Sequence, residues 1–180
     1  MLVYEFKVKG NSYQYQAVDE AIRIGQFIRN KCLRYWMDAS KQERVNRSAL
    51  SRYTKVLSDD SSFPFVSKLN SMARQASSER AWLAISRFYD NCKKKVSGKK
   101  GFPQFKKFSR SVEYKTSGWK LSDNRSYITF TDQTGIGTLK LYGSRDIHFF
   151  QKSDIKRVRL IRRADGYYTQ FCLDLNRVED

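Results

Sequence analysis

The first ten residues alternate between apolar and polar side chains. In the stretch LVYEFKVK, residues 2–9, every second position from Leu2 to Val8 is apolar. A period of two is typical of a strand with one face buried. The pair Gly10-Asn11 that follows is a turn signal and ends the strand. We therefore expect a half-buried strand at the N-terminal end of the fold.

Helical spacing replaces this alternation over the next ninety residues. From about residue 14 to 39, apolar side chains recur at steps of three and four, which predicts a long helix with one apolar stripe. A short helix is expected near 48–57, before the loop SDDSSFP. A second long helix is expected from about 66 to 95, where glycine and proline then end it. Its broad apolar sector favours packing of the three helices as a small bundle.

Beyond residue 100 the spacing becomes that of strands. Candidate strands are 111–116, 126–131, 136–142, 155–163 and 167–175. The last two flank Ala-Asp-Gly, which predicts a hairpin. One strand before the helices and several after them indicate an α+β fold, which we interpret as a small split antiparallel β-barrel with an inserted helical bundle. The predicted domains are residues 1–10 plus 108–180 for the barrel and 11–107 for the helices.

The net charge of the chain indicates what kind of partner it binds. The chain has 35 Lys and Arg against 18 Asp and Glu, a formal net charge of +17. Such an excess favours a polyanionic partner, and nucleic acid is the first candidate. A membrane partner is not expected, because no apolar run approaches the roughly 18 residues of a transmembrane helix and the N-terminus lacks a hydrophobic signal core. A cytoplasmic location is therefore expected.

Groups that could perform catalysis are scarce, and we predict no catalytic residue, metal or cofactor. Cys32, Cys92 and Cys172 are widely separated with no CxxC pair, so we interpret all three as small buried hydrophobes. His148 stands between two apolar residues and is expected to pack against a sheet rather than act as a base. Asp59-Asp60 is expected to be a solvated turn rather than a metal-binding pair.

A cationic and aromatic segment between residues 93 and 115 is the main candidate for binding. Nine basic residues there meet one acid, Glu113, and phosphates attract such a segment. Its rings Phe102, Phe105, Phe108 and Tyr114 either stack on bases or anchor the segment to the core, and we favour anchoring. The strand IKRVRLIRR is either a solvated charged strand or a second backbone contact. The predicted backbone-contacting residues are Lys99, Lys100, Lys106, Lys107, Arg110, Lys115, Arg157 and Arg159.

Polar side chains also gather at the start of the second long helix, in NSMARQASSER. Asn70, Ser71, Arg74 and Gln75 are side chains of the kind that read base edges in a major groove. An ordinary solvated helix face would explain the same residues. Both interpretations stay open on this pattern alone.

Three blocks, ISRFYDN, GFPQFKK and RRADGYY, occur in this order along the chain. With the surrounding order of strand, helices and strands, the chain resembles the N-terminal half of the TnpB family. These are RNA-guided nucleases encoded by bacterial insertion sequences, also called transposases, and are related to type V CRISPR effectors. The resemblance implies a wedge-type barrel with an inserted recognition domain. It also implies two partners, a guide RNA from the transposon end and a target duplex DNA carrying a short motif.

The resemblance further implies which residues would read the DNA motif. It places Ser71 and Gln75 on the recognition helix and Thr116 and Ser117 where the chain enters the barrel. Helix geometry adds Asn70 and Arg74, and the loop before the short helix adds Asn46 and Arg47.

The family's RuvC-like nuclease domain and zinc ribbon would begin after Asp180, so we expect these residues not to cleave DNA. The protein is expected to associate with the nucleoid when bound to DNA. Two alternatives stay open. One is a metal-dependent nuclease in its own right, and the other is a dimerising interaction or regulatory module derived from a truncated transposase.

Overall fold

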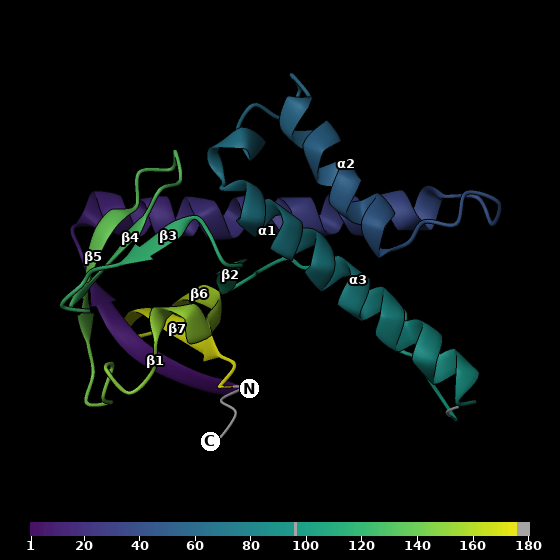
Figure 1. The fold of residues 1–180 in the computed structure, drawn as a ribbon. Helices are drawn as coiled ribbons and strands as arrows, with labels where there is room; N and C mark the ends of the chain where they lie inside the picture. Colours follow the sequence, from purple (N-terminus) through teal and green to yellow (C-terminus); the bar gives the residue numbers. More distant parts are fainter. Residues whose placement is uncertain (96, 176–180) are drawn as a thin grey trace.

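The computed structural model describes residues 1–95 and 97–175 (Figure 1). Within these residues, three α-helices and a seven-stranded antiparallel sheet form an α+β fold, as predicted. The helices follow the first strand, and the remaining six strands come after them.

Side-chain caps decide where the helices begin. Helix α1, Ser12–Asp38, starts with a capping box, in which Asn11 Oδ1 accepts from the Gln14 backbone N–H at 2.9 Å and Gln14 Oε1 accepts from the Asn11 N–H at 3.0 Å. Helix α2, Arg47–Asp59, starts at Asn46, whose side chain accepts from the Ala49 backbone N–H. Both helices lie where the apolar spacing predicts them.

The helix predicted from residue 66 begins five residues later. Val66–Lys68 form a short 3₁₀ turn, η1, and the backbone is extended at Leu69. The Asn70 side chain accepts from the Met72 backbone N–H at 2.8 Å and caps α3, Ser71–Lys93. The predicted start was wrong because the apolar residues before Asn70 have helical spacing although they lie outside α3. The helix begins only after the Asn70 cap.

The strands form one sheet around the N-terminal strand. Their bounds are β1 Leu2–Lys9, β2 Ser111–Tyr114, β3 Trp119–Leu121, β4 Tyr127–Phe130, β5 Gly137–Tyr142, β6 Ile155–Arg163 and β7 Gly166–Leu173, with a 3₁₀ turn η2 at Lys152–Asp154. Their order is β2-β6-β7-β1-β5-β4-β3. The predicted hairpin is confirmed, since β6 and β7 pair from Arg163 opposite Gly166. The three-residue strand β3 was not predicted.

The sheet curls but does not close, so the prediction of a barrel was wrong. The edge strands β2 and β3 pair with different neighbours and not with each other. Residues 115–118 connect these two edges as a turn, in which Trp119 Nε1 donates to the Lys115 carbonyl at 2.8 Å. Within the described residues, no backbone hydrogen bonds join the two edges of the sheet. Side chains pack there instead, with the Tyr114 ring of β2 on the Phe130 ring of β4 at a centroid distance of 5.0 Å.

Helices and sheet share one hydrophobic core. Ile22 and Ile28 of α1, Ile85 of α3 and Phe171 of β7 are all buried in the same cluster. Helix α1 packs tightly on α3 at Gly25, where an added Cβ would lie 3.2 Å from Ser77 Oγ. Beyond this core α3 runs away from the sheet (Figure 1). The division into a sheet domain and a helical domain stays a prediction.

Candidate nucleic-acid interface

Residues 101–110, here called the strap, are fastened along α1 by side-chain amides. Gln26 donates to the Lys107 carbonyl at 3.2 Å and accepts from the Ser109 N–H at 2.6 Å. Asn30, one turn further along the same face, donates to the Lys106 carbonyl at 2.8 Å and accepts from the Lys106 N–H at 2.9 Å. These amides bond the strap backbone much as a neighbouring strand would.

Side chains of the strap line two different hollows. Phe105 lines one hollow, while Lys106 and Phe108 line another. The second hollow, which we call the cationic groove, has a volume of about 520 Å³ and lies between the strap and the helices. Its lining residues are Arg29, Arg80, Leu83, Ala84, Arg87, Lys106, Phe108, Ser109, Arg110 and Ser111. Five of these are cations and none is acidic.

Two guanidinium groups form the buried part of the cationic groove. Arg80 donates to the Ser111 carbonyl at 3.0 Å and to Ser111 Oγ at 3.1 Å, and Arg29 donates to the Gln104 carbonyl at 3.0 Å. Burial lowers the pKa of both groups, although an arginine stays charged in proteins. Within residues 1–95 and 97–175, neither forms an ion pair with a carboxylate. The Glu113 carboxylate still attracts Arg80 and opposes the effect of burial on its pKa, so Arg29 is the stronger candidate for an anionic ligand.

The aromatic side chains of this region differ in their surroundings. Tyr114 is buried in the core and anchors the segment, as we predicted. Phe102 packs on Phe88 with centroids 5.2 Å apart, yet 50% of it is exposed. Phe108 is 86% exposed in the cationic groove, so the anchoring role predicted for it was wrong. An exposed ring among cations is suited to stacking on a base.

Three cations predicted to contact a nucleic-acid backbone are already paired with carboxylates. Glu79 forms ion pairs with Lys115, with Arg157 at 2.9 Å and with Arg47 at 3.0 Å. Glu113 pairs with Arg157 at 3.2 Å and, in a separate contact, with Arg159 at 2.7 Å. These pairs make Lys115, Arg157 and Arg159 weaker candidates for phosphate contacts than the groove cations.

Glu79 is the centre of this network. Burial alone would raise the pKa of its carboxyl, but hydrogen bonds from Lys115, Arg47 and Arg157 outweigh burial and lower the pKa to about 2. Since these partners belong to α2, to β6 and to the residue after β2, one carboxylate ties three parts of the fold to α3.

The remaining predicted backbone contacts lie on or before the strap. Lys99, Lys106, Lys107 and Arg110 are exposed, and no ion pair to them is seen among the described residues. Lys100 is half-buried, and its carbonyl accepts from Asn91 at 3.1 Å. The strap thus presents most of its positive charge to solvent.

The predicted motif-reading residues of α3 and of the turn after β2 lie next to each other. A Cβ added to Gly118 would lie 2.6 Å from Asn70 Cγ, which places the 116–118 turn against the start of α3. Ser71, Thr116 and Ser117 are exposed at this junction. The structure thus brings together residues that are more than forty positions apart in the sequence.

Other members of the predicted set have structural partners. Arg74 donates to the Leu69 carbonyl at 2.7 Å, and burial lowers its pKa. Asn46 accepts from the Ala49 N–H at 2.9 Å as the cap of α2, and Arg47 pairs with Glu79. Gln75 is half-buried one turn into α3. These contacts leave Ser71, Thr116 and Ser117 as the members most accessible to a ligand.

No protein-family model matches this chain, and no curated protein matches it. The resemblance to the TnpB family rests on its three sequence blocks and their order. The guide-RNA and DNA-motif roles that it implies stay predictions.

Two residues weighed for chemistry lie in unexpected places. Cys92 is exposed near the end of α3, where the helix extends beyond the core, so the prediction that all three cysteines are buried was wrong for it. His148 is exposed in the loop after β5 rather than packed against the sheet. In the part of the chain that the structure describes, no three His, Cys, Asp or Glu residues gather as metal ligands.

Among the described residues, no helix has the length and apolar character needed to cross a bilayer.

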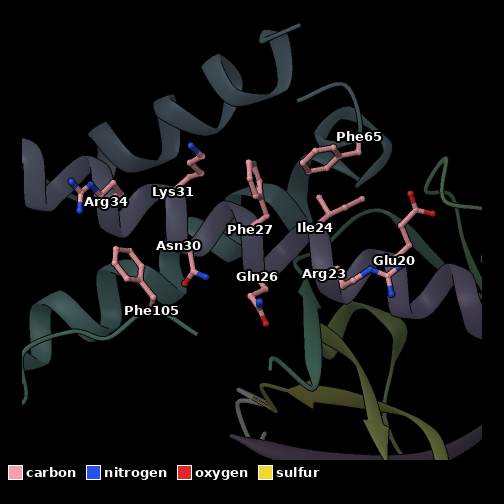
Figure 2. Close-up of a pocket in the computed structure, with 10 residues that line it drawn as sticks. All are labelled: Glu20, Arg23, Ile24, Gln26, Phe27, Asn30, Lys31, Arg34, Phe65 and Phe105. Carbon is pink, nitrogen blue, oxygen red and sulfur yellow. The ribbon is translucent and has the colours of Figure 1, made fainter. Parts of the chain in front are cut away.

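Another hollow lies on the opposite side of the strap (Figure 2). It has a volume of about 700 Å³, with an apolar floor that includes Phe27, Phe65 and Phe105. Arg23 and Glu20 are among its polar lining residues, and Glu20 pairs with Lys68 at 3.3 Å. Its lining has three cations, Arg23, Lys31 and Arg34, against one acid, so it is less strongly cationic than the cationic groove.

Proposed function

We propose that this chain is the nucleic-acid-binding part of a TnpB-like RNA-guided nuclease and that its cationic groove binds an RNA backbone. The observation that carries the proposal is the lining of the groove, which includes five cations, one exposed ring and no carboxylate side chain. Arginine presents a planar fork of donors that fits phosphate oxygens, and an exposed ring accepts a base of any sequence. The net charge of +17 supports the same partner.

The cations of the groove would contribute to binding in two different ways. Arg29 donates to a carbonyl of the strap and Arg80 to a carbonyl of β2, so both side chains are already ordered. Binding a phosphate would therefore cost them little additional conformational entropy. Lys106 and Arg110 are exposed and would add charge at the rim. Each phosphate that these groups neutralise releases counterions, so affinity should fall steeply with salt.

We propose in addition that the junction of α3 with the 116–118 turn reads the motif of a target duplex. Ser71, Thr116 and Ser117 are exposed on the two segments that Asn70 and Gly118 bring into contact, and the TnpB resemblance implies the same residues. The curled sheet and the inserted helices would then correspond to the wedge and recognition parts of that family. Sequence reading at length would belong to pairing with the guide RNA, and these residues would not cleave DNA.

Filter binding of a structured RNA at rising salt tests the groove. We expect affinity to fall between about 50 and 200 mM salt, with a slope that reflects several phosphates. Lys106→Ala and Arg110→Ala should each weaken binding and reduce that slope by about one, with no change in thermal stability. Lys140→Ala, an exposed lysine on β5 at the other half of the sheet, is the control that removes equal charge.

Two results would contradict the proposal. Binding that does not respond to salt would exclude a contact with many phosphates. An equal loss in the Lys140 variant would mean that total charge, and not the groove, attracts RNA.

The apolar floor of the hollow in Figure 2 favours a second candidate, a protein-interaction module. Light scattering distinguishes the two. A dimer at low concentration that ignores added RNA would support the module, whereas a monomer that forms a complex with RNA would support the groove.

A further inference from the structure

A third concave site lies near the far end of α1, at the first residues of the strap. It has a volume of about 670 Å³, within the range usual for small-ligand sites. We call it the aromatic pocket. Its lining residues are Trp36, Met37, Ala39, Ser40, Lys41, Arg44, Val45, Asn46, Tyr89 and Phe102.

Three rings from three segments form its aromatic wall. Trp36 of α1 donates from Nε1 to Tyr89 Oη of α3 at 2.8 Å, which fixes both rings. Their centroids are 5.8 Å apart, and Phe102 of the strap lies 5.7 Å from Trp36. Tyr89 is nevertheless 40% exposed and Phe102 50% exposed, so both offer ring surface to a ligand. Rings used only for packing would be expected to bury more of that surface.

Two cations also line the aromatic pocket. Lys41 and Arg44 come from the loop between α1 and α2 and are both exposed. No ion pair to either is seen within the described residues, and no carboxylate lines the pocket. A lining with aromatic faces and cations is complementary to a nucleotide, because the rings can stack on the base and the cations can bind the phosphate.

We propose that the aromatic pocket binds an unpaired nucleotide of a single strand, with its base against Phe102 and Tyr89 and its phosphate at Lys41 and Arg44. The proposal rests on the proposed function, because the strand would also occupy the cationic groove. Phe102 and Phe108 lie six residues apart on the same strap, which spans at most about 20 Å. One RNA could therefore contact both sites.

Comparison of two RNAs isolates the pocket. The first is a hairpin with a blunt end, and the second is the same hairpin with a short single-stranded tail of adenosines. Binding is measured by fluorescence anisotropy at constant salt. We expect the tail to raise affinity about tenfold, the size of effect that stacking of one base produces.

Variants of both sides of the pocket test the assignment. Phe102→Leu keeps an apolar side chain but removes the ring, and Arg44→Gln removes a charge without touching the core. Each should abolish most of the tail's advantage and leave affinity for the blunt hairpin unchanged. Phe149→Leu, which alters a phenylalanine of similar exposure in the loop after β5, is the matched control.

The outcomes separate this proposal from the proposed function. If the blunt hairpin binds with salt-sensitive affinity but the tail adds nothing, the pocket assignment is wrong and the groove stands. The same holds if Phe102→Leu and Arg44→Gln both keep the tail's advantage. If neither RNA binds, both proposals are wrong.

Discussion

Replacing Glu79 by glutamine tests whether its ion pairs stabilise the fold. The carboxylate is mostly buried and pairs with Arg47, Lys115 and Arg157, which lower its pKa to about 2 from an ordinary value of 4.5. At about 1.4 kcal/mol per pH unit, this difference corresponds to about 3 kcal/mol. Arg47 is largely exposed, and screening by solvent reduces the figure to about 2 kcal/mol.

The sign of the pH dependence follows from the direction of this pKa. Because folding lowers it, the stabilisation is fully present above about pH 4.5 and is lost as the pH falls toward 2. Glu79→Gln should therefore cost about 2 kcal/mol at neutral pH and progressively less in acid, where the wild-type carboxyl is itself protonated.

Urea unfolding of wild type and variant at several pH values measures this difference. Glu43→Gln, at an exposed residue without an ion pair in the described part of the chain, is the control and should cost little at any pH. A Glu79→Gln cost that stays constant from neutral pH into acid would refute the reasoning, since the loss would then come from packing rather than charge.

Three further substitutions probe the packing around the site by thermal unfolding. Tyr114→Phe removes the 2.8 Å hydrogen bond to the buried Asp132 carboxylate and should cost about 1–3 kcal/mol, whereas a neutral result would mean that Asp132 finds another partner. Gly118→Ala should destabilise by more than about 1 kcal/mol, because φ is +96° there and the new Cβ would collide with Asn70; an unchanged midpoint would contradict that contact. Phe105→Ala should cost only about 1 kcal/mol, since the ring is 45% exposed, and a cost several times larger would place it in the core.

Hydrophobic spacing predicted most of the elements because their signals are local. Strand β1, helix α1 and the β6–β7 hairpin appear where their periods place them. The start of α3 was missed because the cap at Asn70 interrupts a spacing that continues through it. Closure of the sheet depends on how its two edges meet, and no local pattern records that.

The candidate site was predictable in its charge but not in its membership. The strap lysines stand out in the sequence, whereas Arg29, Arg80 and Arg87 of the cationic groove come from helices and were missed. Arg29 did leave a signal, since it lies directly after Ile28 on the buried stripe of α1. The sequence predicted a phosphate contact for Arg157 because it gives no sign of the ion pair with Glu79. That partner lies 78 positions away in the sequence.

The fastening of the strap has a consequence for how the binding surface can change. Gln26 and Asn30 hold the strap by its backbone, so its side chains between residues 105 and 108 take no part in these bonds. Lys106 and Ser109 need their N–H groups, and proline alone would break the fastening there. Substitutions of the exposed Lys106, Lys107 and Phe108 can therefore alter what the surface attracts while the fold stays as it is. Under the proposed function, a lineage of such proteins would adapt to new RNAs through these exposed positions, one substitution at a time.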